Sequence, residues 1–269
     1  MSAGAGIRGL GFMSGWGRGA EAVPADARAA AAGRRVLSLG RVEREGERFR
    51  RATREGLLAL SAVELALEDA GADRAAIAGP ETALIYVTAA AYAASNRRFI
   101  EGRGGSIHFA ETAPAVVPAE VAIELGLAGP YAIFLGGSPA TLRAIWHGAR
   151  LLEGEVCERV LILAVEIFEE CADLVGRMGR RVSAPLVESA SCLWMEPGVG
   201  ALRIERGGRA RPRPGLHRRL GETLCCEPLA AVDLWRWSGA VGPLELDGRW
   251  RGERARLVWT DPLGRPRAA

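Results

Sequence analysis

The chain has 269 residues, 49% of them apolar, which is enough for one large α/β domain or two small ones. Its formal charge is only +3 and its basic residues are all arginine, which indicates codon bias more than phosphate binding, so nucleic acid is not an expected partner. Arg8 and several glycines interrupt the start, where a signal peptide would need an apolar core, and no later run is long enough to span a membrane. A cytoplasmic protein is expected.

Apolar strand-like runs alternate with helical periodicity along most of the chain. Helices are expected over 50–71, 118–130 and 139–154, the first two ending at a glycine. The N-terminal glycines, in GLGFMSGWGRG (9–19), are expected to permit close backbone packing at the sheet. Strands are predicted over 7–13, 82–88, 131–135, 159–167, 189–196 and 201–206, the last two as a closing pair with a turn at Pro197 and Gly198.

This order predicts an α/β fold with a mixed five-stranded sheet and helices on both of its faces. The run 159–167 is apolar throughout, which is typical of a central strand covered on both sides.

The composition changes after residue 207, which suggests three parts: a domain over 1–207, a linker or arm over 208–228 rich in Arg, Pro and Gly, and an extension over 229–269. The basic linker is expected to be a solvated loop, with contact to an acidic partner as the alternative. The extension is expected to dock onto its own domain or onto another chain, because it holds four large aromatic residues: Trp235, Trp237, Trp250 and Trp259.

Cysteine and histidine usage restricts the chemistry. The five cysteines form no CxxC pair and several lie in apolar contexts, so neither a zinc site nor a disulfide framework is favoured, and no cofactor or metal is expected. The only histidines are His108, His147 and His217, which leaves few candidates for a general base.

Ser138 lies in GPYAIFLGGSPATLRAIWH (129–147), where an apolar strand passes through two glycines into a helix. Ser138 followed by Pro139 is a good N-terminal cap, and this interpretation is favoured over a nucleophile. The match to the G-x-S-x-G nucleophile elbow is weak, because Ala140 replaces the last glycine.

A serine nucleophile needs a general base within hydrogen-bonding reach. His147 is nine residues further along the same helix, about 13 Å away at 1.5 Å per residue, and is expected to be a packed or rim residue. His108 reaches Ser138 only if a loop brings it there. Glu166, Glu169 and Glu170 are expected to be a solvated acidic cluster.

Five segments, in order, resemble the β-ketoacyl-acyl-carrier-protein synthases of the thiolase superfamily. IRGLGFMSGWGRG is similar to the family's first strand and turn, and SASCLWMEP to its G-x-G-A-A-x-L-V-L-E segment. Between them, LALEDAG, PAEVAIELGLAGP and VLILAVEI resemble successive parts of the family's N-terminal half. The resemblance implies a thiolase-like half domain followed by a small Trp-rich extension.

Two departures bear on activity. Counted from Gly129 and Pro130, the family's nucleophilic cysteine falls on Ser138, so the nucleophile is replaced. The family's two catalytic histidines, in H-G-T-G-T and G-H-x-x-G motifs, have no match in residues 208–269, where His217 is the only histidine.

The resemblance therefore implies an inactive subunit of the chain-length-factor type, paired with an active ketosynthase in fatty-acid or polyketide-type biosynthesis. Itself, as a homodimer, and an acyl carrier protein are the other expected partners. Two alternatives stay open: an acyltransferase or thioesterase that uses Ser138 as acyl acceptor with His108 as base, and a non-catalytic homodimeric scaffold. Residues expected to line an acyl tunnel or the dimer seam are Phe134, Leu135, Thr141 and Trp146, with Ala115, Val116 and Val117 before the preceding helix.

Overall fold

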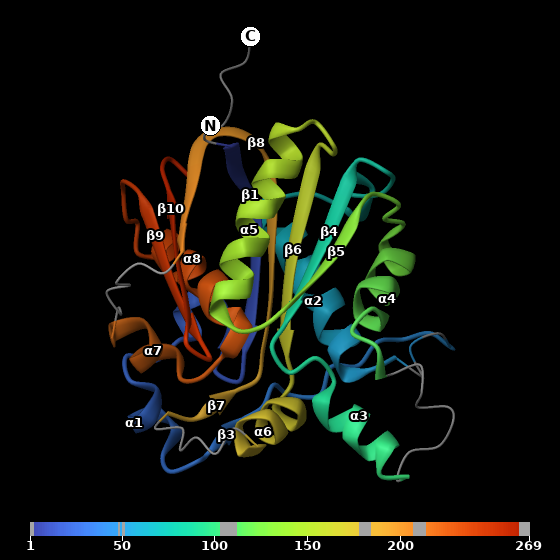
Figure 1. The fold of residues 1–269 in the computed structure, drawn as a ribbon, viewed down its shortest axis with the longest axis vertical. Helices are drawn as coiled ribbons and strands as arrows, with labels where there is room; N and C mark the ends of the chain where they lie inside the picture. The colour runs from blue at the N-terminus through green and yellow to red at the C-terminus, as the bar shows by residue number, and fades with distance from the viewer. Residues whose placement is uncertain are drawn as a thin grey trace.

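The computed structural model describes residues 3–47, 49, 52–102, 112–177, 184–206 and 214–263. Its centre is a mixed sheet of eight strands (Figure 1). These strands are β1 (Ala3–Ser14), β2 (Gly17–Arg18), β4 (Thr82–Thr88), β5 (Tyr131–Leu135), β6 (Arg159–Glu166), β8 (Ser189–Arg206), β9 (Leu244–Trp250) and β10 (Glu253–Trp259). The order is β2-β1-β8-β6-β4-β5, with β10 joined to the second half of β8 and β9 joined to β10.

Helices cover both faces of the sheet, and a two-stranded parallel pair of β3 (Val36–Leu37) and β7 (Leu186–Val187) lies beside it. No helix in the described ranges combines the length and apolar character that crossing a membrane requires. The helices are α1 (Ala27–Ala31), α2 (Arg54–Ala70), α3 (Ala93–Ile100), α4 (Val116–Leu125), α5 (Ser138–Glu153), α6 (Phe168–Arg177), α7 (Pro214–Leu220) and α8 (Glu227–Trp237), with short 3-10 turns η1 (Ala20–Ala22), η3 (Arg74–Ala76) and η5 (Leu224–Cys226).

Alternation along β4 divides the core into two layers, since successive side chains of a strand point to opposite faces. Ala83, Ile85 and Val87 pack with α5 and α8 on one face. Leu84 and Tyr86 pack with α2 and α4 on the other. β6, parallel to β4 and antiparallel to β8, is buried apart from its first residue, which confirms the predicted central strand covered on both sides.

The three predicted helices are present, as α2, α4 and α5, and the two that were predicted to end at a glycine do so. Thr53 caps α2 by accepting a hydrogen bond from the Gly56 N–H, 3.1 Å away. Gly71 ends α2 and Gly126 ends α4, both in the left-handed conformation, with φ of 63° and 66°.

The strand prediction needs two corrections. The predicted closing pair is one continuous strand, β8, because the chain does not turn at Pro197. Pro197 is paired with Ala5 of β1, and the next pair is Ala201 with Gly4, so the extra residues of β8 form an irregular stretch between these two pairs. The predicted five-stranded sheet is the central part of a larger one, because β2 and the C-terminal hairpin of β9 and β10 extend it.

The glycines of β1 permit close backbone packing, as predicted. A Cβ added at Gly11 would lie 2.7 Å from the Ala66 backbone nitrogen of α2 and would also collide with the Ala62 carbonyl oxygen. Gly9 meets the same helix at the Ala66 carbonyl. Because backbone atoms fill the space, only glycine lets α2 lie this close to the sheet.

The C-terminal segment packs on its own domain. β10 pairs with β8 from Ala255 to Trp259, and the buried Trp259 indole donates a hydrogen bond to the Ala5 carbonyl at 3.1 Å. Residues 208–213, the first part of the predicted linker, lie outside the described residues. The rest of it is not the expected solvated loop, because it contains α7 and η5 and buries Leu220, Leu224 and the two cysteines of η5.

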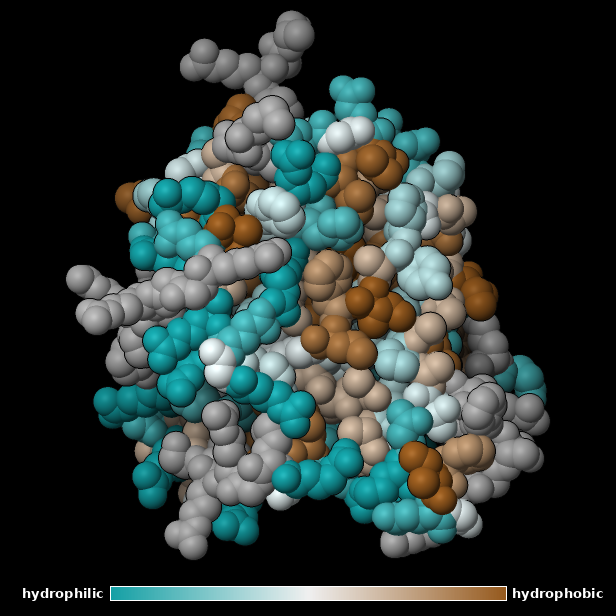
Figure 2. Space-filling model, viewed as in Figure 1, coloured by the Kyte–Doolittle hydropathy of each residue, from teal (hydrophilic) through white to brown (hydrophobic). Residues whose placement is uncertain are grey.

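Two of the outer strands of the sheet, β9 and β5, differ in chemistry. β9 (LELDGRW) carries charged side chains, and Glu245 of this strand pairs with Arg256 of β10. β5 (YAIFL) has no charge, and its Tyr131 and Leu135 are 69% and 57% exposed. Figure 2 shows hydrophilic side chains over the hairpin side of the molecule and apolar side chains gathered over α5 and β5.

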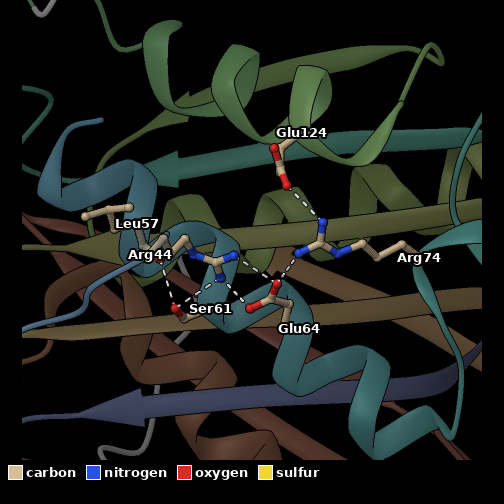
Figure 3. A network of polar contacts seen from close by, with 6 residues as sticks. All are labelled: Arg44, Leu57, Ser61, Glu64, Arg74 and Glu124. Carbon is tan, nitrogen blue, oxygen red and sulfur yellow. Dashed lines mark hydrogen bonds and ion pairs between the residues drawn. The ribbon is translucent and has the colours of Figure 1, made fainter. Parts of the chain in front are cut away.

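An ion-pair network ties the segment before α2 to the helical layer (Figure 3). Glu64 of α2 accepts from Arg44 and from Arg74, which lies 2.6 Å away at Nη2. Arg74 also donates to Glu124 of α4 at 2.8 Å. The network therefore links four segments, although its exposed members contribute little energy individually.

Candidate functional site

The candidate site is the turn between β5 and α5. Gly136 has φ of 144°, and Gly137 is the N-cap residue of α5. Ser138 is the first residue of the helix, and no side chain caps this end. The prediction that Ser138 is the N-terminal cap is therefore wrong by one position, because Gly137 has the extended cap conformation and the serine hydroxyl has other partners.

The Ser138 hydroxyl is buried, with 3% of the residue exposed. Its Oγ lies 2.7 Å from Glu227 Oε2 and 3.1 Å from the Leu224 carbonyl oxygen. One turn later, Thr141 Oγ1 donates to the Cys225 carbonyl at 2.6 Å. Both hydroxyls at the start of α5 thus hold the η5 segment and the start of α8 in place.

Glu227 is a hydrogen-bond partner of Ser138 that the sequence did not indicate. Burial raises the pKa of its carboxyl, while the Ser138 hydrogen bond and the more distant His217 lower this pKa and Glu222 raises it. A neutral carboxyl has an O–H to donate and an ionised carboxylate only accepts. Glu227 in its ionised form is therefore the one group hydrogen-bonded to Ser138 that can take up its proton.

The three histidines lie in different parts of the chain. His108 lies outside the described residues, so its predicted role as a base stays a prediction. His147 packs against Phe134, with ring centroids 5.7 Å apart, as expected for a packed or rim residue. His217 of α7 acts on Glu227 only as a nearby charge.

The residues predicted to line an acyl tunnel or a seam lie in two places, around the junction of β5 and α5 and at the start of α4. Thr141 is fully buried against η5, and Phe134 and Trp146 pack on the core from a partly buried position. Leu135 is exposed at the end of β5. Before α4, Ala115 is the N-cap residue, Val116 begins the helix and Val117 is buried in the core.

The acidic residues at the end of β6 and the start of α6 are not a solvated cluster, which corrects the prediction for two of them. Glu166 and Glu170 are 1% and 3% exposed, whereas Glu169 faces solvent. Glu166 accepts from the Ala89 N–H at 2.5 Å, and Glu170 accepts from the Ala94 N–H at 2.6 Å. The carboxylates are buried because they bind the backbone of the segment that leads into α3.

A small cavity lies beside this cluster, at the carboxyl ends of β4 and β6. Glu55, Tyr86, Tyr92, Glu166 and Glu170 are among its lining residues. Burial raises the pKa of Glu55 and of Glu166 to about 7, with further increases at Glu55 from the charges of Glu170, Glu169 and Glu120. Within the described ranges, no three His, Cys, Asp or Glu side chains are grouped to hold a metal ion.

These raised pKa values predict that stability falls as pH rises from about 4.5 to 7. The native state retains a proton on Glu55 in this window, whereas the unfolded chain, with a Glu pKa of 4.5, has lost it. Glu55→Gln removes this loss, so the change that it makes in the free energy of unfolding should be more favourable at pH 8 than at pH 4.5 by about 3 kcal/mol.

Urea unfolding at a series of pH values measures this difference. Glu68→Gln, at an exposed position of the same helix, is the matched control. Parallel pH profiles for wild type and Glu55→Gln would contradict the assignment.

Comparison with known proteins identifies the family of the chain. The family model described as "Beta-ketoacyl synthase, N-terminal domain" matches residues 42–183, more than half of the chain. A search of curated proteins gave no match.

Solved structures share the fold at low sequence identity. The ishigamide ketosynthase/chain length factor is 14% identical with a TM-score of 0.73, over 96% of this chain and 99% of that one. A ketosynthase in complex with its chain length factor from Xenorhabdus doucetiae is 13% identical with a TM-score of 0.65, over 96% and 99%. The PfaC keto synthase-chain length factor is 10% identical with a TM-score of 0.70, over 100% of this chain and 44% of that one.

Proposed function

The chain belongs to the β-ketoacyl synthase N-terminal domain family, and on that premise we propose that it is a non-catalytic subunit which pairs with an active ketosynthase. Its thiolase-like α/β fold supplies the strand, glycine turn and helix of the family's acyl-accepting site. Ser138 stands where the resemblance puts the nucleophilic cysteine. In the proposed role, the chain supports condensation in fatty-acid or polyketide-type biosynthesis, while the partner carries out the chemistry and receives acyl groups from the carrier protein.

The proposal rests on the hydrogen bonds of the Ser138 hydroxyl. It is buried and bonded to the Leu224 carbonyl and to Glu227, both within the same chain. A cysteine at a helix start is activated by the positive helix end, which lowers its thiol pKa. A serine gains far less there, and here its hydroxyl holds η5 and α8 against α5.

The exposed β5 supports pairing. An edge strand has unpaired N–H and C=O groups, and proteins usually protect such an edge with charges. β9 has this protection, whereas β5 combines exposed Tyr131 and Leu135 with no charge at all. We place the partner on the β5 surface, defined as Tyr131, Phe134, Leu135 and His147.

Substitution of Leu135 tests this surface. Leu135→Glu places a charge on β5 at a site that is 57% exposed, so the fold should survive and pairing should weaken at least tenfold. Co-expression with a β-ketoacyl synthase chosen as the candidate partner, followed by size-exclusion chromatography, measures the complex. Val241→Glu, at a loop residue 96% exposed, is the control that should still co-elute.

Two wild-type proteins that elute separately, with the ketosynthase fully active alone, would contradict the pairing. Elution of the wild-type chain as a dimer of itself would instead favour the homodimeric scaffold.

A second function is favoured by one distance. Glu227 Oε2 lies 2.7 Å from Ser138 Oγ, within the reach required of a general base. In this alternative, Glu227 accepts the hydroxyl proton as Ser138 attacks an acyl thioester, and the thiolate leaves. Incubation with acyl-carrier-protein thioesters should then give a mass increase that is lost in Ser138→Ala.

A further inference from the structure

The β9–β10 hairpin lies directly on the turn that holds Ser138. A Cβ added at Gly137 would lie 2.6 Å from the Trp250 ring, so the indole packs directly against the turn. A Cβ added at Gly248 would lie 2.8 Å from the Ser138 carbonyl carbon and 3.0 Å from its Cβ. Gly248 lets the hairpin backbone approach the Ser138 backbone, and Gly137 leaves room for the Trp250 ring.

Several contacts fix the hairpin in this position. Arg143 of α5 forms an ion pair with Glu253 of β10. Trp250 also packs against a small cluster that contains Ala90, Cys171 and Leu224. On its other side, β10 pairs with β8 over five residues, so the hairpin belongs to the main sheet. The ring of Trp250 is thus held from the sheet and from α6 while it covers the turn.

We infer that the β9–β10 hairpin is a built-in cap whose Trp250 closes the Ser138 turn to acyl groups. The inference deepens the proposed function and rests on it: the site lost its chemistry by closure as well as by the change to serine. A cysteine introduced at position 138 should therefore stay unreactive for as long as the hairpin, with Gly248 against residue 138 and Trp250 against Gly137, covers the turn.

Alkylation of an introduced thiol tests the cap. Ser138→Cys is treated with iodoacetamide in the full chain and labelling is followed by intact mass, alone and combined with Trp250→Ala. The double variant should label at least ten times faster than Ser138→Cys alone. Trp250→Ala without the new cysteine measures the background of the five native cysteines, all of which are buried. Ser138→Cys with Trp237→Ala, which removes a tryptophan 60% exposed at the end of α8, should label as slowly as Ser138→Cys.

If the Trp250→Ala double variant does not fold, Ser138→Cys with Glu253→Ala takes its place, because loss of the ion pair loosens the hairpin and leaves the core intact. Equal labelling rates for Ser138→Cys and the opened variant would overturn the cap.

Co-elution with the ketosynthase, measured on the same proteins, distinguishes a failure of the cap from a failure of the proposed pairing. Fast labelling of Ser138→Cys with intact co-elution contradicts the cap alone, whereas slow labelling with separate elution contradicts the pairing alone.

Discussion

Gly11→Ala should lower the free energy of unfolding by about 3 kcal/mol. Gly11 of β1 lies under α2, where a new methyl group meets the Ala62 carbonyl oxygen, the Ala66 nitrogen at 2.7 Å and the Leu65 Cβ at 2.8 Å. Two of the three atoms belong to the helix backbone, so no side-chain rotation relieves the overlap. α2 must move away from β1, and the packing of the layer between them loosens with it.

Urea denaturation of wild type and variant measures this loss. Gly40→Ala is the matched control, because Gly40 has no positive φ and nothing lies within 4 Å of an added Cβ. A change below about 0.5 kcal/mol for Gly11→Ala would show that α2 and β1 are not packed this closely.

Glu188→Ala should cost a similar amount, about 3 kcal/mol, because it breaks a buried ion pair from one side. Glu188 is 1% exposed and accepts from Arg54 Nε at 2.7 Å and Nη2 at 2.6 Å. It also accepts from the Leu39 N–H at 2.6 Å, while Arg54 donates to the Leu39 carbonyl at 2.7 Å. One carboxylate thus fastens the segment before α2 to the strand layer.

Trypsin cleavage provides the local readout. The variant should be cut faster at Arg41 and Arg44, which follow Leu39 in that segment, and the free energy of unfolding should fall. Glu205→Ala removes the partner of Arg203 at the surface, where the loss should stay below about 0.5 kcal/mol. Unchanged cleavage with unchanged stability would show that Glu188 does not hold the segment.

Local signals predicted most of the fold. The periodicity of α2 and the glycine after it, Gly71, predict a helix that buries one face. The uninterrupted apolar run of β6 predicts a central strand, because such a run must be buried on both faces. The turn predicted at Pro197 is absent because β8 continues through an irregular stretch beside Ala5. Whether the strand continues there depends on its pairing with β1, which the local sequence does not show. The hairpin of β9 and β10 joins β8 through long-range pairing, which periodicity does not reveal.

The site was predictable only in part. Ser138 and the shape of its turn follow from the local sequence, but Glu227 is 89 residues away and reaches Ser138 through tertiary packing alone. Glu166 and Glu170 looked like a solvated cluster because acidic residues usually face water. Their burial depends on the backbone amides of Ala89, Ala90 and Ala94, which the sequence does not place beside them.

Reconstitution of condensing activity with Ser138→Ala tests the central claim that Ser138 holds structure and carries no acyl group. The ketosynthase is assayed alone, with the wild-type chain and with the variant, and acyl adducts on the chain are sought by intact mass. The account predicts that activity requires the chain, that Ser138→Ala supports it within about twofold of wild type, and that no adduct forms. Loss of activity with Ser138→Ala in a folded complex, together with an adduct on wild type that the variant lacks, would contradict it.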